Sequence, residues 1–89
     1  MMNKKLSIKY RAVDKDGNLF CNAYGKDANL PYVADSYLDV SHYVAYYWKR
    51  CYAKLQVCKD GNKWEDASEF DQKLFQKRLD ADFFFQETK

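Results

Sequence analysis

The sequence predicts an α+β fold of the order ββαββα, with an antiparallel sheet covered on one face by two helices. Three observations support this fold class. Residues 5–13 and 53–58 alternate apolar and polar side chains, which is typical of half-buried strands. Residues 40–51 place apolar side chains on one face of a helix, and an Asp-Gly turn follows each alternating segment. With 89 residues, the chain has room for a single small domain, residues 1–89, with one modest core.

The first hairpin is predicted over residues 5–24. In its first strand, apolar residues share one side and basic or polar residues share the other: Leu6, Ile8, Tyr10 and Ala12 against Lys5, Ser7, Lys9 and Arg11. The Asp16-Gly17 turn follows, and residues 19–24 return as the second strand. We expect a short helical turn that Asn29 and Pro31 open, and an extended path over residues 32–40 is the alternative.

A helix over residues 40–52 is the strongest single signal in the chain. Its apolar residues recur at intervals of three and four: Val40, Tyr43, Val44, Tyr47, Trp48 and Cys51. We expect this face to form the centre of the core. Asp39 or Ser41 is expected to cap the start of the helix, and Lys49 and Arg50 lie where the helix dipole favours cations.

The second hairpin is predicted over residues 53–66. Ala53, Leu55 and Val57 alternate with polar residues in its first strand, and residues 63–66 form a short second strand. The C-terminal helix is predicted over residues 67–85, because Asp66 and Glu69 resemble a capping box at its start.

The C-terminal helix carries two apolar faces at about 100° per residue. One face holds Phe70, Leu74, Ala81 and Phe84 or Phe85, and the other holds Phe75, Leu79 and Phe83. Two such faces imply two partners, so three arrangements are open. The helix lies between parts of its own fold, or one face meets another chain, or the Phe83 to Phe85 end leaves the helix as an extended tail. If a homodimer forms, its expected contacts are Phe75, Leu79 and Phe83.

The turn sequence Lys-Asp-Gly-Asn occurs twice, at residues 15–18 and 59–62. The match extends over residues 13–23 and 57–67, with Val, an aromatic residue and Ala at corresponding positions. Duplication of a ββα unit is one explanation. The other is that Asp-Gly favours turns wherever it occurs, so that similar hairpins arise without a common origin.

Composition and charge limit the classes of protein to which this chain can belong. The net charge is only +2, which weighs against a nucleic-acid partner, and no apolar run predicts a membrane span or a signal peptide. Three cysteines without CxxC spacing indicate reduced thiols in a cytoplasm. The aromatic residues comprise eight Tyr, six Phe and two Trp, too many rings for so small a core, so some must lie on the surface.

No motif in the sequence predicts catalysis, a metal or a cofactor. The loop after Asp14 lacks the glycine and glutamate positions of an EF-hand. His42 and the three cysteines lack zinc-ligand spacing, and no cluster of glycines could cradle a phosphate. We therefore expect a protein that is not an enzyme, with no metal and no cofactor.

Two surfaces are candidates for binding. The first is the outer row of the central helix, His42, Tyr46, Lys49 and Arg50, because Tyr and Arg dominate protein interfaces. The second is the basic face of the first strand, Lys5, Lys9 and Arg11, joined by Lys54, which would suit a nucleic acid. Solvated charges that discourage strand aggregation are the simpler explanation for that face.

The sequence favours a small non-enzymatic protein-binding module. In size and character, it is similar to the small phage or mobile-element proteins that block a host complex, such as a defence system, by occupying one of its surfaces. This is a likeness of class, because no family motif covers the chain. A small nucleic-acid-binding domain that uses the basic strand face is the alternative.

Overall fold

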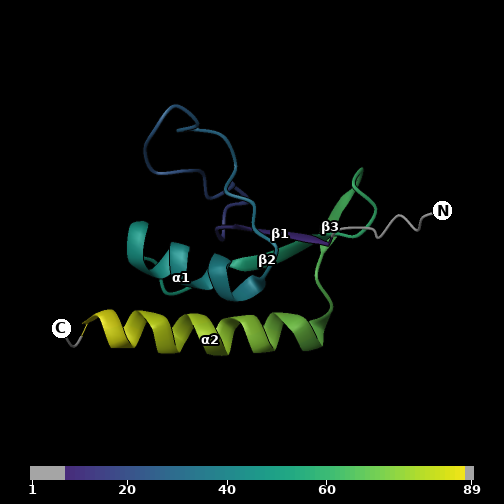
Figure 1. Ribbon diagram of the computed structural model, residues 1–89. Coiled ribbons are helices and arrows are strands. Elements are labelled where there is room, and N and C mark those ends of the chain that lie inside the picture. The colour runs from purple at the N-terminus through teal and green to yellow at the C-terminus, as the bar shows by residue number, and fades with distance from the viewer. Residues whose placement is uncertain (1–7, 88–89) are drawn as a thin grey trace.

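The structure, a computed structural model, describes residues 8–87. Its elements are β1 (Lys9–Val13), α1 (Tyr37–Tyr47), β2 (Lys54–Cys58), β3 (Trp64–Asp66) and α2 (Glu69–Glu87). The fold is α+β: a three-stranded antiparallel sheet of order β1-β2-β3 and two helices that pack together (Figure 1). The predicted fold class is therefore confirmed. The four-stranded ββαββα order was wrong, because the described chain runs β-α-β-β-α.

The sheet brings the alternating segments into register. β1 and β2 pair from Lys9 opposite Cys58 to Val13 opposite Lys54, and β3 lies antiparallel on the far side of β2. Ala12, Leu55 and Val57 are buried in the core. The second predicted hairpin is thus present as β2 and β3. Residues 5–7, with the predicted start of the first strand, lie outside the described residues.

The return strand predicted at residues 19–24 is absent. Leu19 makes only an isolated bridge to Val13, and the chain then forms the long loop that rises above the sheet in Figure 1. The predicted helical turn near Pro31 is also absent, because this segment runs extended. Its backbone bridges to Cys21, and the amide of Ala34 donates to the carbonyl of Tyr10 at 3.0 Å. These bonds to the edge of β1 replace the helical ones.

α1 begins and ends earlier than predicted. Ser36, not Asp39 or Ser41, caps it: the Ser36 hydroxyl accepts from the amide of Leu38 at 3.1 Å. The helix ends at Tyr47 because Trp48 caps it and Lys49 adopts a left-handed φ of 56°. Lys49, Arg50 and Cys51 therefore lie outside the helix, and Cys51 is exposed rather than in the core.

The buried face of α1 is also rotated from the one expected. Its buried residues are Val40, Ser41, Val44 and Ala45. Val40 and Val44 were predicted, but the small residues Ser41 and Ala45 take the places expected for Tyr43 and Tyr47. Small side chains on this side let the other helix pack closely, and the larger rings face the long loop.

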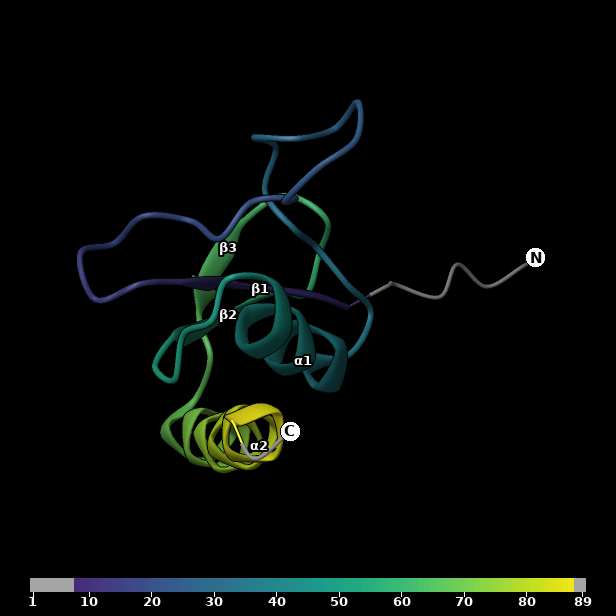
Figure 2. The same ribbon diagram turned by 90° about the vertical axis from the view of Figure 1, so that its left-hand side faces the viewer.

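α2 supplies the far wall of the core. Ser68, rather than Asp66, caps it by accepting from the amide of Asp71 at 3.1 Å. The helix continues through Phe83 to Phe85, so the extended tail was wrong. Viewed nearly along its axis in Figure 2, α2 lies under α1, and Ser41 Oγ of α1 lies 2.9 Å from Asp82 Oδ2 of α2. No helix in residues 8–87 is long and apolar enough to cross a membrane.

The structure decides which face of α2 closes the core. Phe75 and Leu79 are 0% exposed, and Phe83 packs against the same cluster. These are the side chains that the sequence assigned to a homodimer. Because the chain buries Phe75 and Leu79 in its own core, these two have no surface to offer a second copy, and Phe83 is partly buried there. The exposed face is the one with Phe70, Leu74 and Phe84.

Candidate functional site

Four tyrosines form a continuous cluster on the surface between α1 and the long loop, and we call them the tyrosine cluster: Tyr24, Tyr32, Tyr43 and Tyr47. Tyr32 stacks on Tyr43 with ring centroids 3.8 Å apart and planes 7° apart. Tyr43 lies 4.5 Å from Tyr47, and Tyr24 meets Tyr47 edge-on at 5.7 Å. Tyr24 is 65% exposed and Tyr47 is 45% exposed. The cluster therefore presents large aromatic area to solvent.

Backbone hydrogen bonds fix the shape of the loop that carries Tyr24 and Tyr32. The amide of Asn22 donates to the carbonyl of Leu30 at 2.8 Å, and the amide of Tyr32 donates to the carbonyl of Phe20 at 3.0 Å. The loop tip turns at Gly25 and Asn29, which have φ values of 92° and 79°. Because the loop is bonded across itself, the two tyrosines keep a defined position.

Side chains of α1 and its cap hold the loop against the helix. The hydroxyl of Tyr43 accepts from the amide of Ala23 at 2.7 Å, and the indole nitrogen of Trp48 donates to the carbonyl of Cys21 at 2.8 Å. The Tyr24 hydroxyl donates to the Tyr47 hydroxyl at 3.2 Å. The cluster is thus preorganised, so a partner would pay little entropy to order it.

Two hydroxyls of the cluster, those of Tyr24 and Tyr32, have raised pKa values. The hydrogen bond to Tyr47 raises the pKa of Tyr24 above the ordinary value for a tyrosine. Burial raises the pKa of Tyr32, and the negative charge of nearby Asp39 raises it further. Tyr24 and Tyr32 therefore bring neutral hydroxyls and aromatic faces close to a carboxylate.

The predicted row on α1 does not stay together. His42 stacks on Tyr46 with centroids 4.1 Å apart, in a groove beside Arg78 and Asp82 of α2. Tyr46 packs partly against the core. Lys49 donates to the Tyr46 carbonyl at 2.9 Å, whereas the early end of the helix directs Arg50 into a different cleft. The structure brings His42 and Tyr46 together and separates them from Arg50.

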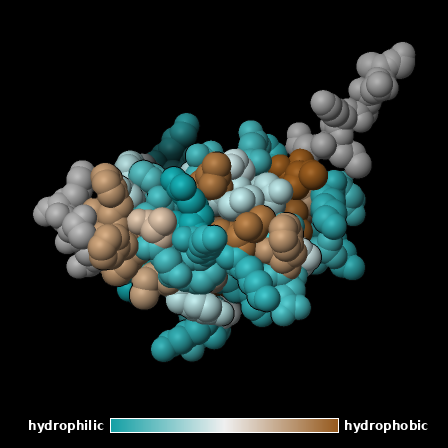
Figure 3. Space-filling model, turned by 90° about the horizontal axis from the view of Figure 1, so that it is seen from below, coloured by the Kyte–Doolittle hydropathy of each residue, from teal (hydrophilic) through white to brown (hydrophobic). Residues whose placement is uncertain are grey.

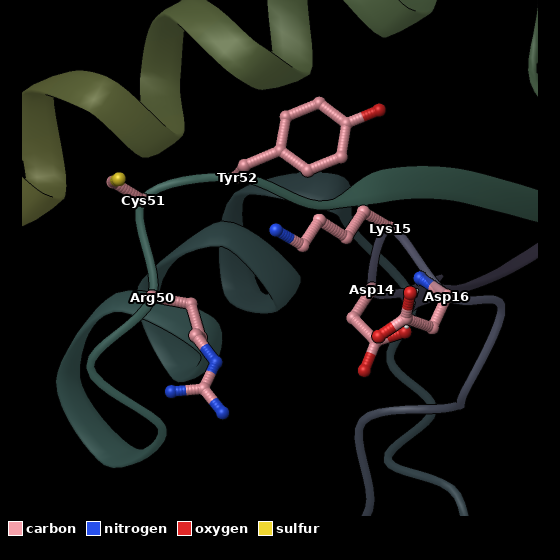
Figure 4. Close-up of a pocket in the computed structure, with 6 residues that line it drawn as sticks. All are labelled: Asp14, Lys15, Asp16, Arg50, Cys51 and Tyr52. Carbon is pink, nitrogen blue, oxygen red and sulfur yellow. Dashed lines mark hydrogen bonds between the residues drawn. The ribbon is translucent and has the colours of Figure 1, made fainter.

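The cleft that Arg50 enters lies between the turn after β1 and the segment that follows α1. It has a volume of about 370 Å³, and Figure 4 shows Arg50 on one side with Asp14 and Asp16 on the other. Hydrogen bonds from backbone amides, that of Asn18 above all, hold the pKa of Asp14 below its ordinary value. The carboxylate therefore stays ionised near neutral pH. Cys51 lies at the opposite end of the cleft from both carboxylates (Figure 4).

The described residues of the predicted basic face, Lys9, Arg11 and Lys54, all have partners within the chain. Lys9 pairs with Asp35, and Lys54 pairs with Asp66 at 3.4 Å. Arg11 donates to the Gln56 side chain at 2.9 Å and lies 4.3 Å from the centre of the Trp64 ring. Burial lowers the pKa of Arg11. Lys5 lies outside the described residues. These partners reduce the charge available to a phosphate backbone.

Two further observations concern the chemistry of the described residues. Ser41 and Asp82 are bonded, but Ser41 is 0% exposed, so no substrate reaches its hydroxyl. Within residues 8–87, no three His, Cys, Asp or Glu side chains gather so that they could hold a metal ion.

The tyrosine cluster is the feature that inspection of the sequence missed. Helical spacing assigned Tyr43 and Tyr47 to the core, and nothing in the pattern linked them to Tyr24 and Tyr32 on the loop. The excess of aromatic rings predicted that some would lie on the surface, but it did not identify which ones.

Comparisons of the chain with protein-family models, curated proteins and solved structures find no match. The fold and the surface are therefore the grounds on which a function can be argued.

Proposed function

We propose that this protein is a non-enzymatic module that binds another protein through the tyrosine cluster. The observation that carries the proposal is that four tyrosines in ring contact, two of them well exposed, are held in place by bonds between the loop and α1. Tyrosine is enriched in protein interfaces because it offers large contact area and a hydrogen-bonding group at low entropic cost.

The chemistry around the cluster indicates the kind of surface that it would meet. Aromatic faces attract guanidinium and ammonium groups, and the charge of Asp39 reaches Tyr32. A partner that inserts an arginine or a lysine between apolar side chains would satisfy both features. The proposed mode of action is occupation of one surface of a larger host complex, as phage or mobile-element inhibitors do, and the proposed setting is a reducing cytoplasm where the three free thiols persist.

The nucleic-acid alternative receives less support from the structure. Lys9, Arg11 and Lys54 each have an acidic, amide or aromatic partner in the chain. We therefore retain nucleic-acid binding only as an outcome of the test.

The test is affinity capture from a lysate of the source organism and its natural host, with three forms of the protein as bait. The Tyr24→Ala/Tyr47→Ala variant removes the exposed half of the cluster. Tyr52→Ala is the matched control, because Tyr52 is 51% exposed and lies outside the cluster. We expect wild type and Tyr52→Ala to retain the same protein, and the double variant to lose at least about tenfold in affinity, the loss of a single hot spot.

Circular dichroism and thermal unfolding must show that the double variant is folded. Equal capture by all three folded forms would contradict the proposal. Capture of material that nuclease removes would favour the basic strand face instead.

A further inference from the structure

A second surface runs along the solvent side of α2, opposite the face that closes the core. Phe70 is 69% exposed, Leu74 is 36% exposed and Phe84 is 69% exposed. With Lys77 and Ala81 between them, they follow one another at intervals of four, three, four and three residues. This spacing is that of a helix that packs along another helix. Figure 3 shows this side of the molecule, with hydrophobic side chains at its left end and again from the middle to the right, and hydrophilic ones among them.

Charged residues flank the stripe in a regular order. At about 100° per residue, Lys73 and Asp80 lie along one flank, and Asp71 and Arg78 lie along the other. Each flank therefore carries one base and one acid seven residues apart. The base comes first on one flank and the acid comes first on the other.

This order is complementary to itself when two copies of α2 lie antiparallel. In that arrangement, each flank faces the same flank of the other copy. Lys73 then meets Asp80, Asp71 meets Arg78, and the two-fold axis repeats both pairs. In the same register, Phe70 lies over the small Ala81 of the second copy, and the Lys77 stem covers Leu74 while its ammonium reaches water.

A parallel arrangement of the two helices would bring like charges together at these same residues. Each flank would then face the opposite flank, so that Lys73 would meet Arg78. Lys77 would also face its own counterpart at the centre of the contact. Like charges at these positions destabilise helix pairs, and flanking charges are known to set the orientation of paired helices. The pattern therefore selects the antiparallel pair.

We propose that α2 is a self-association surface, and that a second copy of this chain pairs with it antiparallel in the register that sets Lys73 against Asp80. The contact uses Phe70, Leu74, Lys77 and Ala81 and leaves the tyrosine cluster on other elements. Arg78 lies 3.6 Å from Asp82 of its own helix, but its side chain is 55% exposed and can also reach Asp71 of the second copy. The proposal does not depend on the proposed function of the tyrosine cluster.

Charge reversal tests the register directly. Lys73→Glu places two acids opposite each other, and Asp80→Lys places two bases opposite each other. The double variant Lys73→Glu/Asp80→Lys restores opposite charges at both symmetric positions. Lys63→Glu is the control, because it makes the same change of charge at an exposed site outside α2.

The measurement is sedimentation equilibrium over a range of protein concentrations. Wild type and Lys63→Glu should approach twice the chain mass of 10.6 kDa. Each single reversal on α2 should weaken association at least about tenfold, and the double variant should recover to within about threefold of wild type. Wild type that stays monomeric throughout would overturn the proposal, as would a double variant as weak as the single ones.

Discussion

The two loops that share the Lys-Asp-Gly-Asn sequence lead to different structures. In the first loop, the Asp14 carboxylate accepts from the amides of Asp16 and Asn18, both at 2.9 Å. In the second loop, the Asp60 carboxylate accepts from the amides of Asn62 and Lys63 at 2.9 and 3.0 Å. When the two loops are aligned, the carboxylate that accepts these bonds therefore lies two positions later in the second loop than in the first.

The residue two positions before the shared aspartate explains why a different carboxylate accepts the bonds in each loop. It is Asp14 in the first loop and Cys58 in the second, and Cys58 is buried and carries no carboxylate. After the first loop, a single bridge joins Val13 to Leu19, whereas after the second loop β2 and β3 pair regularly. The same four residues thus permit a turn, and the residues outside them decide whether a hairpin follows. The hydrogen bonds of the two loops do not correspond, and this weakens the case for duplication.

The largest contrast is expected at the aromatic residues that align after the two loops, Phe20 and Trp64. Phe20 is buried in the core next to Trp48, whereas Trp64 lies on the sheet beneath Arg11. Phe20→Ala should lower the free energy of unfolding by about 3–5 kcal/mol, the usual cost of emptying a core site. Trp64→Ala should cost about 1–2 kcal/mol through lost area and the cation–π contact. Urea unfolding measures both, and equal losses would contradict the contrast.

Substitution of the two turn glycines, Gly17 and Gly61, should reduce stability equally, because both loops require a left-handed backbone conformation at this position. Gly17 and Gly61 have φ values of 85° and 84°, and a β-carbon at either would meet no atom within 4 Å. Only the backbone conformation therefore opposes a side chain. Gly17→Ala and Gly61→Ala should each destabilise the protein by about 1 kcal/mol in thermal unfolding. Replacement by Asn, which tolerates this conformation, should cost less at both positions.

The smallest effect is expected in the acid dependence of stability. Hydrogen bonds from the amides of Asn62 and Lys63 lower the pKa of Asp60. A carboxyl whose pKa is lower in the folded state stabilises the protein above its unfolded pKa of about 4, and this stabilisation is lost as the pH falls through the folded pKa. Asp60→Asn should therefore reduce the loss of stability below about pH 4. Asp16→Asn is the control, because Asp16 aligns with Asp60 but contributes its amide to the bond with Asp14.

Short-range patterns predicted much of this fold. β2, β3 and α2 lie close to their predicted ranges because alternation and helical spacing act within a few residues. α1 was misplaced at both ends because its start depends on Ser36, and its end depends on a left-handed conformation that Lys49 is not expected to adopt. Tyr43 and Tyr47 do share one face of α1, as their spacing predicted, but that face is not the core face. Spacing alone could not show this, because tyrosine suits a solvated surface as well as a core.

The candidate sites were less accessible to sequence reasoning, because they depend on contacts between distant segments. Tyr32 stacks on Tyr43 only because bonds between residues 20 and 32 return the loop to α1. On α2, periodicity revealed both apolar faces but not which one faces inward. The packing of α1 on α2 decides that, since it places Phe75 and Leu79 in one core cluster with Ala45.

The position of α2 in the chain has a consequence for biosynthesis. The ribosome makes α1 and all three strands before it makes Phe75 and Leu79, two of the largest buried side chains. Until they emerge, Val40, Val44 and Leu55 lack the wall that covers them in the folded chain, and such exposed apolar surface is what chaperones and proteases recognise. The core that these residues form can thus close only after α2 has been made.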